Sequence, residues 1–139
     1  MTSPIPFRPG PPGSKVAIVV EDDRATSLLV ATTLTQLFTV YVADSANRAM
    51  QMLLEIPTPS LVVCDVAMPG VDGIHFIKEL RAIPKLAGTP VIFLTARTMP
   101  NDVAAGMSAG ARYYMTKPFR PGDLLEKAQK ATGVAGPAK

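Results

Sequence analysis

The sequence predicts an α/β protein in which helices cover both faces of a parallel β-sheet. Short apolar runs rich in β-branched residues recur along the chain, and a segment with helical spacing or helix-start signals follows each of them. Five such strand–helix units fit between residues 15 and 132. Since consecutive parallel strands need a crossover connection that is usually a helix, this alternation indicates a doubly wound sheet.

The five strands are expected at residues 16–20, 40–42, 61–64, 91–94 and 113–115. Most of these runs are apolar throughout and show no alternation with polar residues. Continuous apolar character is typical of parallel strands that are buried on both faces. We therefore expect these runs to form the centre of the domain.

The first two helices are expected to pack on the sheet through faces with helical spacing. For the helix over residues 24–38, that face is formed by Leu28, Leu29, Thr32, Leu34 and Leu37. Asp44 or Ser45 can cap the second helix, and Pro57 and Pro59 end it. Its apolar stripe is formed by Ala46, Ala49, Met50, Leu53 and Leu54.

The last three helices are expected over residues 73–83, 101–109 and 121–132. The first of them carries Ile74, Ile77 and Leu80 at helical spacing. The second is a poorer helix because it contains Gly106, which disfavours the helical backbone. The third begins with Pro121, whose missing amide costs nothing at a helix start.

The two ends of the chain differ in composition from the part between them. Residues 1–14 hold five of the 14 prolines together with two glycines, which predicts a flexible, extended tail. Residues 133–139 are expected to form a second, shorter flexible tail. Neither tail is expected to contribute to the core, so the domain itself is predicted over residues 15–132.

Composition and charge exclude several classes of protein. The lone Cys64 cannot form a disulfide within the chain, and no run approaches the roughly 20 apolar residues of a membrane span. The formal charge is +3, but Arg8 and Lys139 lie in the tails and leave +1 for residues 15–132. So small a net charge does not indicate direct nucleic-acid binding. A protein of the reducing cytoplasm is therefore expected.

Polar side chains follow the strands at the points where ligands bind in open parallel sheets. Glu21, Asp22 and Asp23 follow the first strand, Asp65 the third, Thr95 the fourth and Lys117 the fifth. Clustered carboxylates repel one another unless a cation lies between them, and carboxylate oxygens suit Mg²⁺. A carboxylate beside Mg²⁺, an ammonium and a hydroxyl can also accept a phosphoryl group.

Four motifs in this order resemble the receiver domain of two-component response regulators. They are Val-Val-Glu21-Asp22-Asp23, Asp65-Val-Ala-Met-Pro-Gly-Val-Asp72-Gly73, Leu94-Thr95-Ala96, and Ala-Gly-Ala-Arg-Tyr-Tyr114-Met-Thr-Lys117-Pro118-Phe119. The resemblance covers about residues 15 to 132, and it implies a flavodoxin-like, five-stranded (βα)5 sheet in the order 2-1-3-4-5.

The resemblance also implies a phosphoacceptor and its metal ligands. Asp65 matches the phosphoacceptor, which takes its phosphoryl group from a phosphohistidine on a sensor histidine kinase or a histidine phosphotransfer domain. Asp22 matches a direct Mg²⁺ ligand, and Glu21 the acidic neighbour that acts through a metal-bound water. Ala67 matches the position that offers its backbone carbonyl to the metal. Such a domain is a signalling protein that catalyses only its own phosphorylation and dephosphorylation.

The remaining matched residues imply a switch. Thr95 matches the hydroxyl that turns toward the phosphoryl group, and Tyr114 the aromatic residue that follows it inward. Lys117 matches the ammonium that pairs first with Asp65 and then with the phosphoryl group, and Lys117-Pro118 matches a cis peptide bond. A downstream protein would read the switch on the surface formed by the fourth helix, fifth strand and fifth helix.

Some residues near the motifs depart from the receiver pattern or have a structural explanation. Ala67 stands where receivers with short-lived phosphate have an amide or acid, so a long-lived acyl phosphate is expected. His75 is expected to be solvated or packed, Cys64 to fill the core, and Asp23 and Asp72 to cap helices. The alternative function is a receiver-like interaction module that works without phosphorylation. A stand-alone protein is favoured by Met1 over a domain of a hybrid kinase or larger regulator.

Overall fold

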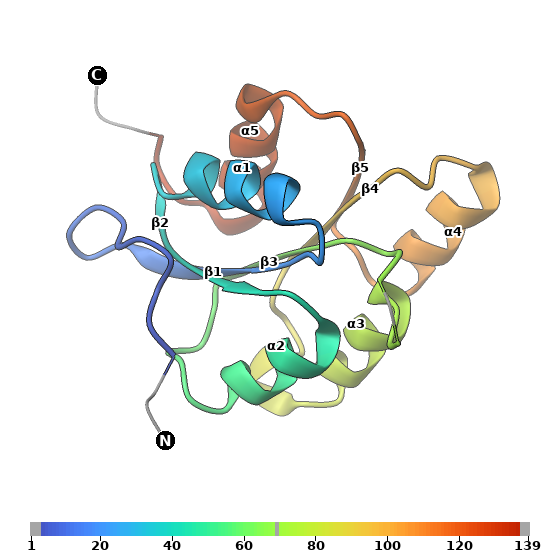
Figure 1. Cartoon of the computed structure of the whole chain (residues 1–139), viewed down its shortest axis with the longest axis horizontal. Helices are drawn as coiled ribbons and strands as arrows, with labels where there is room; N and C mark the ends of the chain where they lie inside the picture. Colours follow the sequence, from blue (N-terminus) through green and yellow to red (C-terminus); the bar gives the residue numbers. More distant parts are fainter. Residues whose placement is uncertain (1–3, 69, 137–139) are drawn as a thin grey trace.

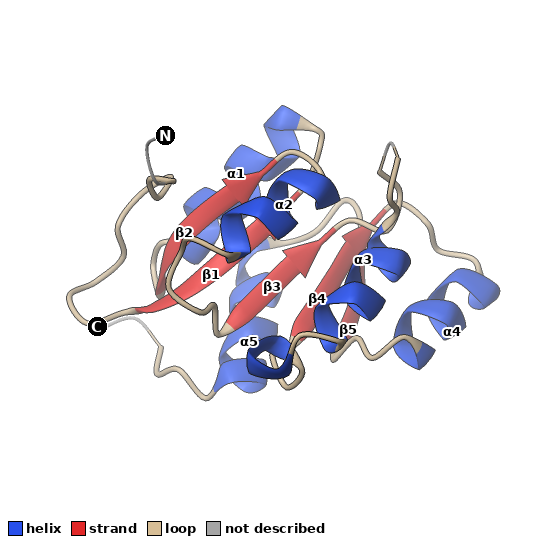
Figure 2. Cartoon of the chain, turned by 90° about the horizontal axis from the view of Figure 1, so that it is seen from below, coloured by secondary structure: helices blue, strands red, loops and turns tan. Residues whose placement is uncertain are grey.

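The computed structural model describes residues 4–68 and 70–136, and it shows a single five-stranded parallel sheet (Figures 1 and 2). The strands are β1 (Lys15–Val20), β2 (Phe38–Ala43), β3 (Leu61–Cys64), β4 (Val91–Thr95) and β5 (Tyr113–Thr116). Their order in the sheet is β2-β1-β3-β4-β5. The predicted fold class and strand order are therefore confirmed.

Helices cover both faces of the sheet, as predicted. They are α1 (Arg24–Leu34), α2 (Ala46–Leu53), α3 (Gly73–Arg81), the 3₁₀ helix η1 (Pro84–Leu86), α4 (Pro100–Ser108) and α5 (Pro121–Thr132). Figure 1 shows α1 and α5 on one face, α2 and α3 on the other, and α4 at the outer end near β5. Each face has its own cluster of buried apolar side chains. None of the helices in the described ranges is long and apolar enough to span a membrane.

Three helices begin with the side-chain caps that the sequence predicts. Asp23 accepts a hydrogen bond from the amide of Thr26 at 2.9 Å, and Asp72 accepts one from the amide of His75 at 2.8 Å. Of the two candidates for α2, Ser45 is the N-cap. Each cap satisfies one amide that has no partner within the first turn of its helix.

The buried face of α1 differs from the predicted one. Leu28 and Leu29 are 41% and 48% exposed and Thr32 is exposed as well, so this part of the prediction is wrong, whereas Leu34 and Leu37 are buried as predicted. The helix also ends at Leu34, and Phe38, expected within it, begins β2. The residues that pack on the sheet are Ser27, Val30, Ala31, Thr33 and Leu34. Three of these five residues are small or carry a hydroxyl group, and a prediction that favours large apolar residues misses them. The same bias placed Leu54 in the stripe of α2, where it is 79% exposed and Met52 is buried instead.

Segments near both ends of the described chain pack against the core, although neither tail is predicted to contribute to it. The amide of Phe7 donates to the Val40 carbonyl at 2.7 Å, and the Val40 amide donates to the Arg8 carbonyl at 3.3 Å. Phe7 and Val134 also pack against the apolar cluster under α1 and α5. The physical reason is that β2 is an edge strand with unpaired backbone groups, which the N-terminal segment satisfies in part.

Candidate functional site

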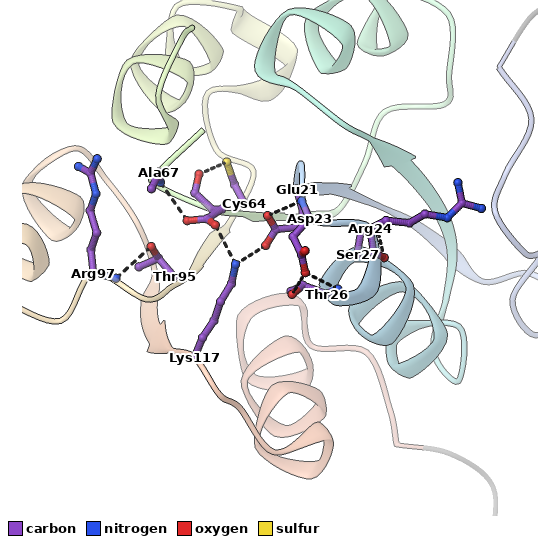
Figure 3. A network of polar contacts seen from close by, with 11 residues as sticks. Glu21, Asp23, Arg24, Thr26, Ser27, Cys64, Ala67, Thr95, Arg97 and Lys117 are labelled. Atoms are coloured by element: carbon purple, nitrogen blue, oxygen red, sulfur yellow. Dashed lines mark hydrogen bonds and ion pairs between the residues drawn. The ribbon is translucent and has the colours of Figure 1, made fainter. Parts of the chain in front are cut away.

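The sheet order brings the polar residues at the strand ends together. Glu21 directly follows β1 and Asp65 directly follows β3, and these strands are neighbours at the centre of the sheet. Lys117 follows β5, and Figure 3 shows its side chain reaching toward Glu21. Since the strands are parallel, their carboxyl ends share one edge of the sheet, and all three side chains meet there.

Lys117 bridges two buried carboxylates. Its Nζ lies 2.5 Å from Oε1 of Glu21 and 2.8 Å from Oδ2 of Asp65. Glu21 is only 4% exposed and Asp65 only 6%. The other carboxylate oxygen of Asp65, Oδ1, accepts a hydrogen bond from the Ala67 amide at 2.9 Å. Both oxygens of Asp65 are therefore held in a defined orientation.

The charges in this cluster shift two of its pKa values. Burial raises the pKa of Glu21 above its ordinary value, and the charge of Asp65 adds to this, although the hydrogen bond from Lys117 opposes it. Burial alone would lower the pKa of Lys117, but its hydrogen bonds to Asp65 and Glu21 outweigh that effect and raise it. Lys117 therefore carries a positive charge at neutral pH.

The acidic residues fit a divalent metal ion. Glu21, Asp22 and Asp65 each offer a carboxylate oxygen, and these atoms lie within 4.8 Å of one another. Asp22 is exposed, so the group opens to solvent on one side. One ammonium faces three carboxylates, which leaves negative charge for a cation to neutralise. Hard oxygen donors of this kind suit Mg²⁺.

A chain of hydrogen bonds connects the hydroxyl groups of Thr95 and Tyr114. Thr95 is the fully buried last residue of β4, and its Oγ1 accepts a hydrogen bond from the Arg97 amide at 3.3 Å. The Tyr114 hydroxyl donates to the carbonyl of the same residue, Arg97, at 2.7 Å. The Arg97 backbone thus contacts both hydroxyl groups. In Figure 3, Thr95 and Arg97 lie on the opposite side of Lys117 from Glu21.

Gly73 ends the motif that begins at Asp65, and the structure gives it a role that the sequence does not predict. A Cβ atom at Gly73 would lie 2.4 Å from the Asp65 carbonyl oxygen and 2.9 Å from Cα of Val66. The Gly73 amide donates to the Val66 carbonyl at 2.9 Å. Only glycine allows α3 to begin this close to the backbone of Asp65. The signal in the sequence was a helix-disfavouring glycine directly after the capping Asp72.

The other residues considered in the sequence lie outside the acidic cluster or have a structural role. Cys64 is buried, and burial raises the pKa of its thiol well above the ordinary value, so the thiol stays protonated. His75 is exposed on α3 and pairs with Glu79 at 3.0 Å. The Lys117–Pro118 peptide bond is cis, as the resemblance implied. Pro69, in the motif that follows Asp65, lies outside the described residues.

Comparison with known proteins decides the family. The family model described as response regulator receiver domain matches residues 17–129. This chain belongs to the response regulator receiver domains. It is 39% identical over 105 residues to "Response regulator Rre1" of Synechocystis sp., covering 71% of this chain and 45% of that protein. It is 37% identical over 111 residues to "Phosphate regulon transcriptional regulatory protein PhoB" of Escherichia coli, covering 79% and 48%.

Solved receiver structures agree in fold. A putative response regulator from Chloroflexus aurantiacus superposes with a TM-score of 0.81 at 29% identity, covering 86% of this chain and 98% of that one. The chemotaxis response regulator CheY4 of Vibrio cholerae gives 0.78 at 27% identity, covering 85% and 98%. This receiver therefore spans nearly the full length of those chains, but about half the length of several curated relatives.

Proposed function

We propose that this receiver domain accepts a phosphoryl group on the carboxylate of Asp65. The observation that carries the proposal is the setting of that carboxylate, which is buried, oriented by the Ala67 amide and paired with Lys117 at 2.8 Å. The donor is a phosphohistidine of a sensor histidine kinase or a histidine phosphotransfer domain. Family membership supports this choice of donor, because receivers work in two-component systems.

The transfer of the phosphoryl group needs only the Asp65 carboxylate and the phosphohistidine as reactants. A carboxylate oxygen of Asp65 attacks the phosphorus, an O–P bond forms, and the P–N bond of the phosphohistidine breaks. The electron pair of that bond returns to the imidazole nitrogen of the donor. Lys117 neutralises charge that develops on the phosphoryl oxygens, since it already lies against Asp65.

Glu21, Asp22 and Asp65 would hold Mg²⁺ together with the backbone carbonyl of Ala67. When bound, Mg²⁺ supplies further positive charge beside the phosphoryl oxygens. Glu21 shares Lys117 with Asp65, so its carboxylate also keeps the ammonium in place between the two acids. The role of the chain itself is thus to position the acceptor and to balance its charge.

Phosphorylation would then change the surface near β5. The acyl phosphate adds nearly two negative charges, and the hydroxyl of Thr95 is expected to leave the Arg97 amide and donate to a phosphoryl oxygen. Because Tyr114 bonds the Arg97 carbonyl, that movement reaches Tyr114 as well. A groove of about 510 Å³ runs beside β5 and α5 and is lined by Met115, Phe119 and Lys127, among others. We assign the downstream partner to the α4–β5–α5 surface.

The acyl phosphate is expected to be long-lived. Ala67 is exposed beside Asp65, and its methyl group has no atom that can orient an attacking water molecule. Replacing it with an amide, as in Ala67→Asn, should shorten the half-life of the phosphorylated protein severalfold. The half-life is measured by intact mass after removal of the phosphodonor. An unchanged half-life contradicts this part of the proposal.

The test of the central proposal is phosphorylation by acetyl phosphate. With Mg²⁺ present, intact mass should show one added phosphoryl group, and chelation of Mg²⁺ should prevent it. Asp65→Asn should abolish the adduct. Asp72→Asn is the matched control, because Asp72 is an exposed acid that only caps α3. If no adduct forms, the proposal is wrong and the alternative, an interaction module that works without phosphorylation, is favoured. An adduct that persists in Asp65→Asn also contradicts the proposal, because another residue would then be the acceptor.

A further inference from the structure

We propose that Gly106 is a positioning residue for Tyr114: the missing side chain of Gly106 opens a notch in α4 that admits the tyrosine ring. This inference rests on the proposed switching role of Tyr114. Gly106 is the one residue of α4 that is buried. Its backbone lies within a regular helix and is not among the glycines with positive φ. The backbone conformation therefore does not require glycine at this position.

The reason is the space that the tyrosine ring occupies. A Cβ atom at Gly106 would lie 2.8 Å from both Cδ2 and Cε2 of Tyr114, and 3.2 Å from Cδ2 of Phe93. Contacts under about 3 Å between carbon atoms are strongly repulsive, since the optimum is about 3.5–4.0 Å. An alanine at position 106 thus cannot coexist with the ring in its present place.

In this conformation the ring is also held on other sides. Its edge packs on Phe93, with ring centroids 6.0 Å apart and an interplanar angle of 64°. Its hydroxyl is anchored on the Arg97 carbonyl at 2.7 Å. A methyl group at position 106 must therefore move α4 outward or turn the ring away from Phe93. Either change weakens the hydrogen bond that connects Tyr114 to the loop after Thr95.

The notch and helix propensity predict opposite changes in Tm for Gly106→Ala. A glycine inside a helix is less favourable than alanine, so Gly106→Ala should raise the Tm if α4 propensity alone mattered. If the notch serves the ring, Gly106→Ala should lower the Tm instead. In a Tyr114→Ala background the clash with the tyrosine ring is gone and only the 3.2 Å approach to Phe93 remains. The same substitution should then lower the Tm less, or raise it.

The test is a double-mutant cycle followed by thermal unfolding. The variants are Gly106→Ala, Tyr114→Ala, Tyr114→Phe, and Gly106→Ala combined with each Tyr114 change. Tyr114→Phe keeps the ring without the hydroxyl, so Gly106→Ala should still lower the Tm in that background. Gly122→Ala is the control, because a Cβ atom at this exposed glycine in α5 meets no atom within 4 Å. Its Tm should stay the same or rise.

The result that overturns the proposal is an equal Tm shift on Gly106→Ala with and without Tyr114. A second readout tests the positioning role directly. The aromatic NMR signals of Tyr114 and the amide signal of Arg97 should shift in Gly106→Ala without phosphodonor, while Gly122→Ala leaves them unchanged. Unchanged Tyr114 signals in Gly106→Ala also overturn the proposal.

The failure of this proposal can be told apart from failure of the proposed function. Phosphorylation of Asp65 by acetyl phosphate should proceed at the same rate within about twofold in Gly106→Ala, because the notch does not contact the acidic cluster. A protein that takes no phosphoryl group refutes the acceptor role and leaves the thermal cycle valid. A phosphorylation rate that falls more than tenfold in Gly106→Ala contradicts the separation of the notch from the acceptor site.

Discussion

The two edge strands of the sheet differ in how far they are buried and covered. At one edge, four of the six residues of β2 are buried, and the backbone of Phe7 and Arg8 pairs with Val40. At the other edge, no residue of β5 is fully buried, and α4 beside it buries only a glycine. The residues assigned to switching, Thr95 and Tyr114, lie on β4 and β5.

The difference teaches where this domain can change conformation. An element with few buried apolar side chains opens at a lower free-energy cost than one in the core. The covered edge contributes fully buried side chains to the apolar clusters, whereas β5 contributes only half-buried ones, so a movement of β5 disturbs less of the core. A switch at the open edge therefore costs the fold little. Four experiments test this contrast, beginning with the largest expected effect.

Truncating one core side chain at each edge should give the largest difference. Phe38 in β2 is fully buried, so Phe38→Ala should lower the free energy of unfolding by about 3–5 kcal/mol. Met115 in β5 is partly exposed, and Met115→Ala should lower it by less than about 2 kcal/mol. Urea denaturation measures both values. Equal losses would mean that the two edges are equally well packed.

Arg81 is expected to be the main polar anchor of the open edge. Its guanidinium donates to the carbonyls of Leu86 and Thr89 at 3.2 and 2.7 Å, and to that of Gly110, after α4, at 3.1 Å. Arg81→Ala should lower the free energy of unfolding by roughly 1–3 kcal/mol, since several carbonyls lose a charged donor.

Hydrogen exchange locates the effect of the Arg81 change. Amide exchange should accelerate in the α4–β5 turn while β1 and β2 stay protected. Arg81→Lys is the matched variant, and it should recover only part of the loss because a single ammonium lacks the planar fork of the guanidinium. Uniform acceleration across the whole sheet would show that Arg81 does not anchor this edge in particular.

The acidic cluster between the edges should make stability depend on pH. The pKa of Glu21 is raised above its ordinary value, chiefly by burial, so the folded protein binds this proton more tightly than the unfolded chain. The stability from this group is present below about pH 4.5, the ordinary pKa of Glu, and is lost as the pH rises through the raised pKa of the folded state.

Glu21→Gln should remove this dependence. Without metal, the variant should gain stability relative to the natural protein as the pH increases from 4 to 7, as measured by urea denaturation. Saturating Mg²⁺ should stabilise the natural protein more than the variant at pH 7, because ligand binding to the folded state adds to its stability. If the difference in stability between the natural protein and the variant is the same at pH 4 and pH 7, Glu21 does not cause the pH dependence.

The smallest effect is expected at the N-terminal segment that covers β2. Phe7 is only partly buried, so Phe7→Ala should lower the free energy of unfolding by about 1 kcal/mol. Exchange of the Val40 amide should accelerate, because that amide donates to the Arg8 carbonyl. Ile5→Ala is the control, since Ile5 is 84% exposed. If both variants exchange alike at Val40, the segment does not cover the edge in solution.

Local chemistry predicted most of the fold and the composition of the site. The strand positions, the caps Asp23 and Asp72, and the start of α5 at Pro121 were read from residues that act within one turn or one strand. Glu21, Asp65, Thr95 and Lys117 were found because each occurs where a strand ends. These features depend on short-range rules, so no knowledge of the packing was needed.

The errors lie where a residue's role depends on a distant neighbour. Leu28 and Leu29 have the hydrophobicity of a core face, but the face that α1 turns to the sheet contains the smaller Ser27 and Ala31 instead. Phe7 lies in a segment whose proline content resembles a free tail, and only the unpaired edge of β2 explains its packing. Gly73 and Gly106 lie against a backbone and rings that belong to residues outside their own helices.

The sequence alone determined the alternation of strands and helices and the kinds of side chain at the strand ends, because periodicity and residue chemistry are local. The resemblance implied that Lys117 pairs with Asp65, but only the tertiary structure placed Glu21 against the same ammonium, 96 positions away along the chain. That contact depends on the strand order, which follows from how whole faces of helices and strands bury against one another. The charge balance of the site therefore arises from the packing of the entire sheet.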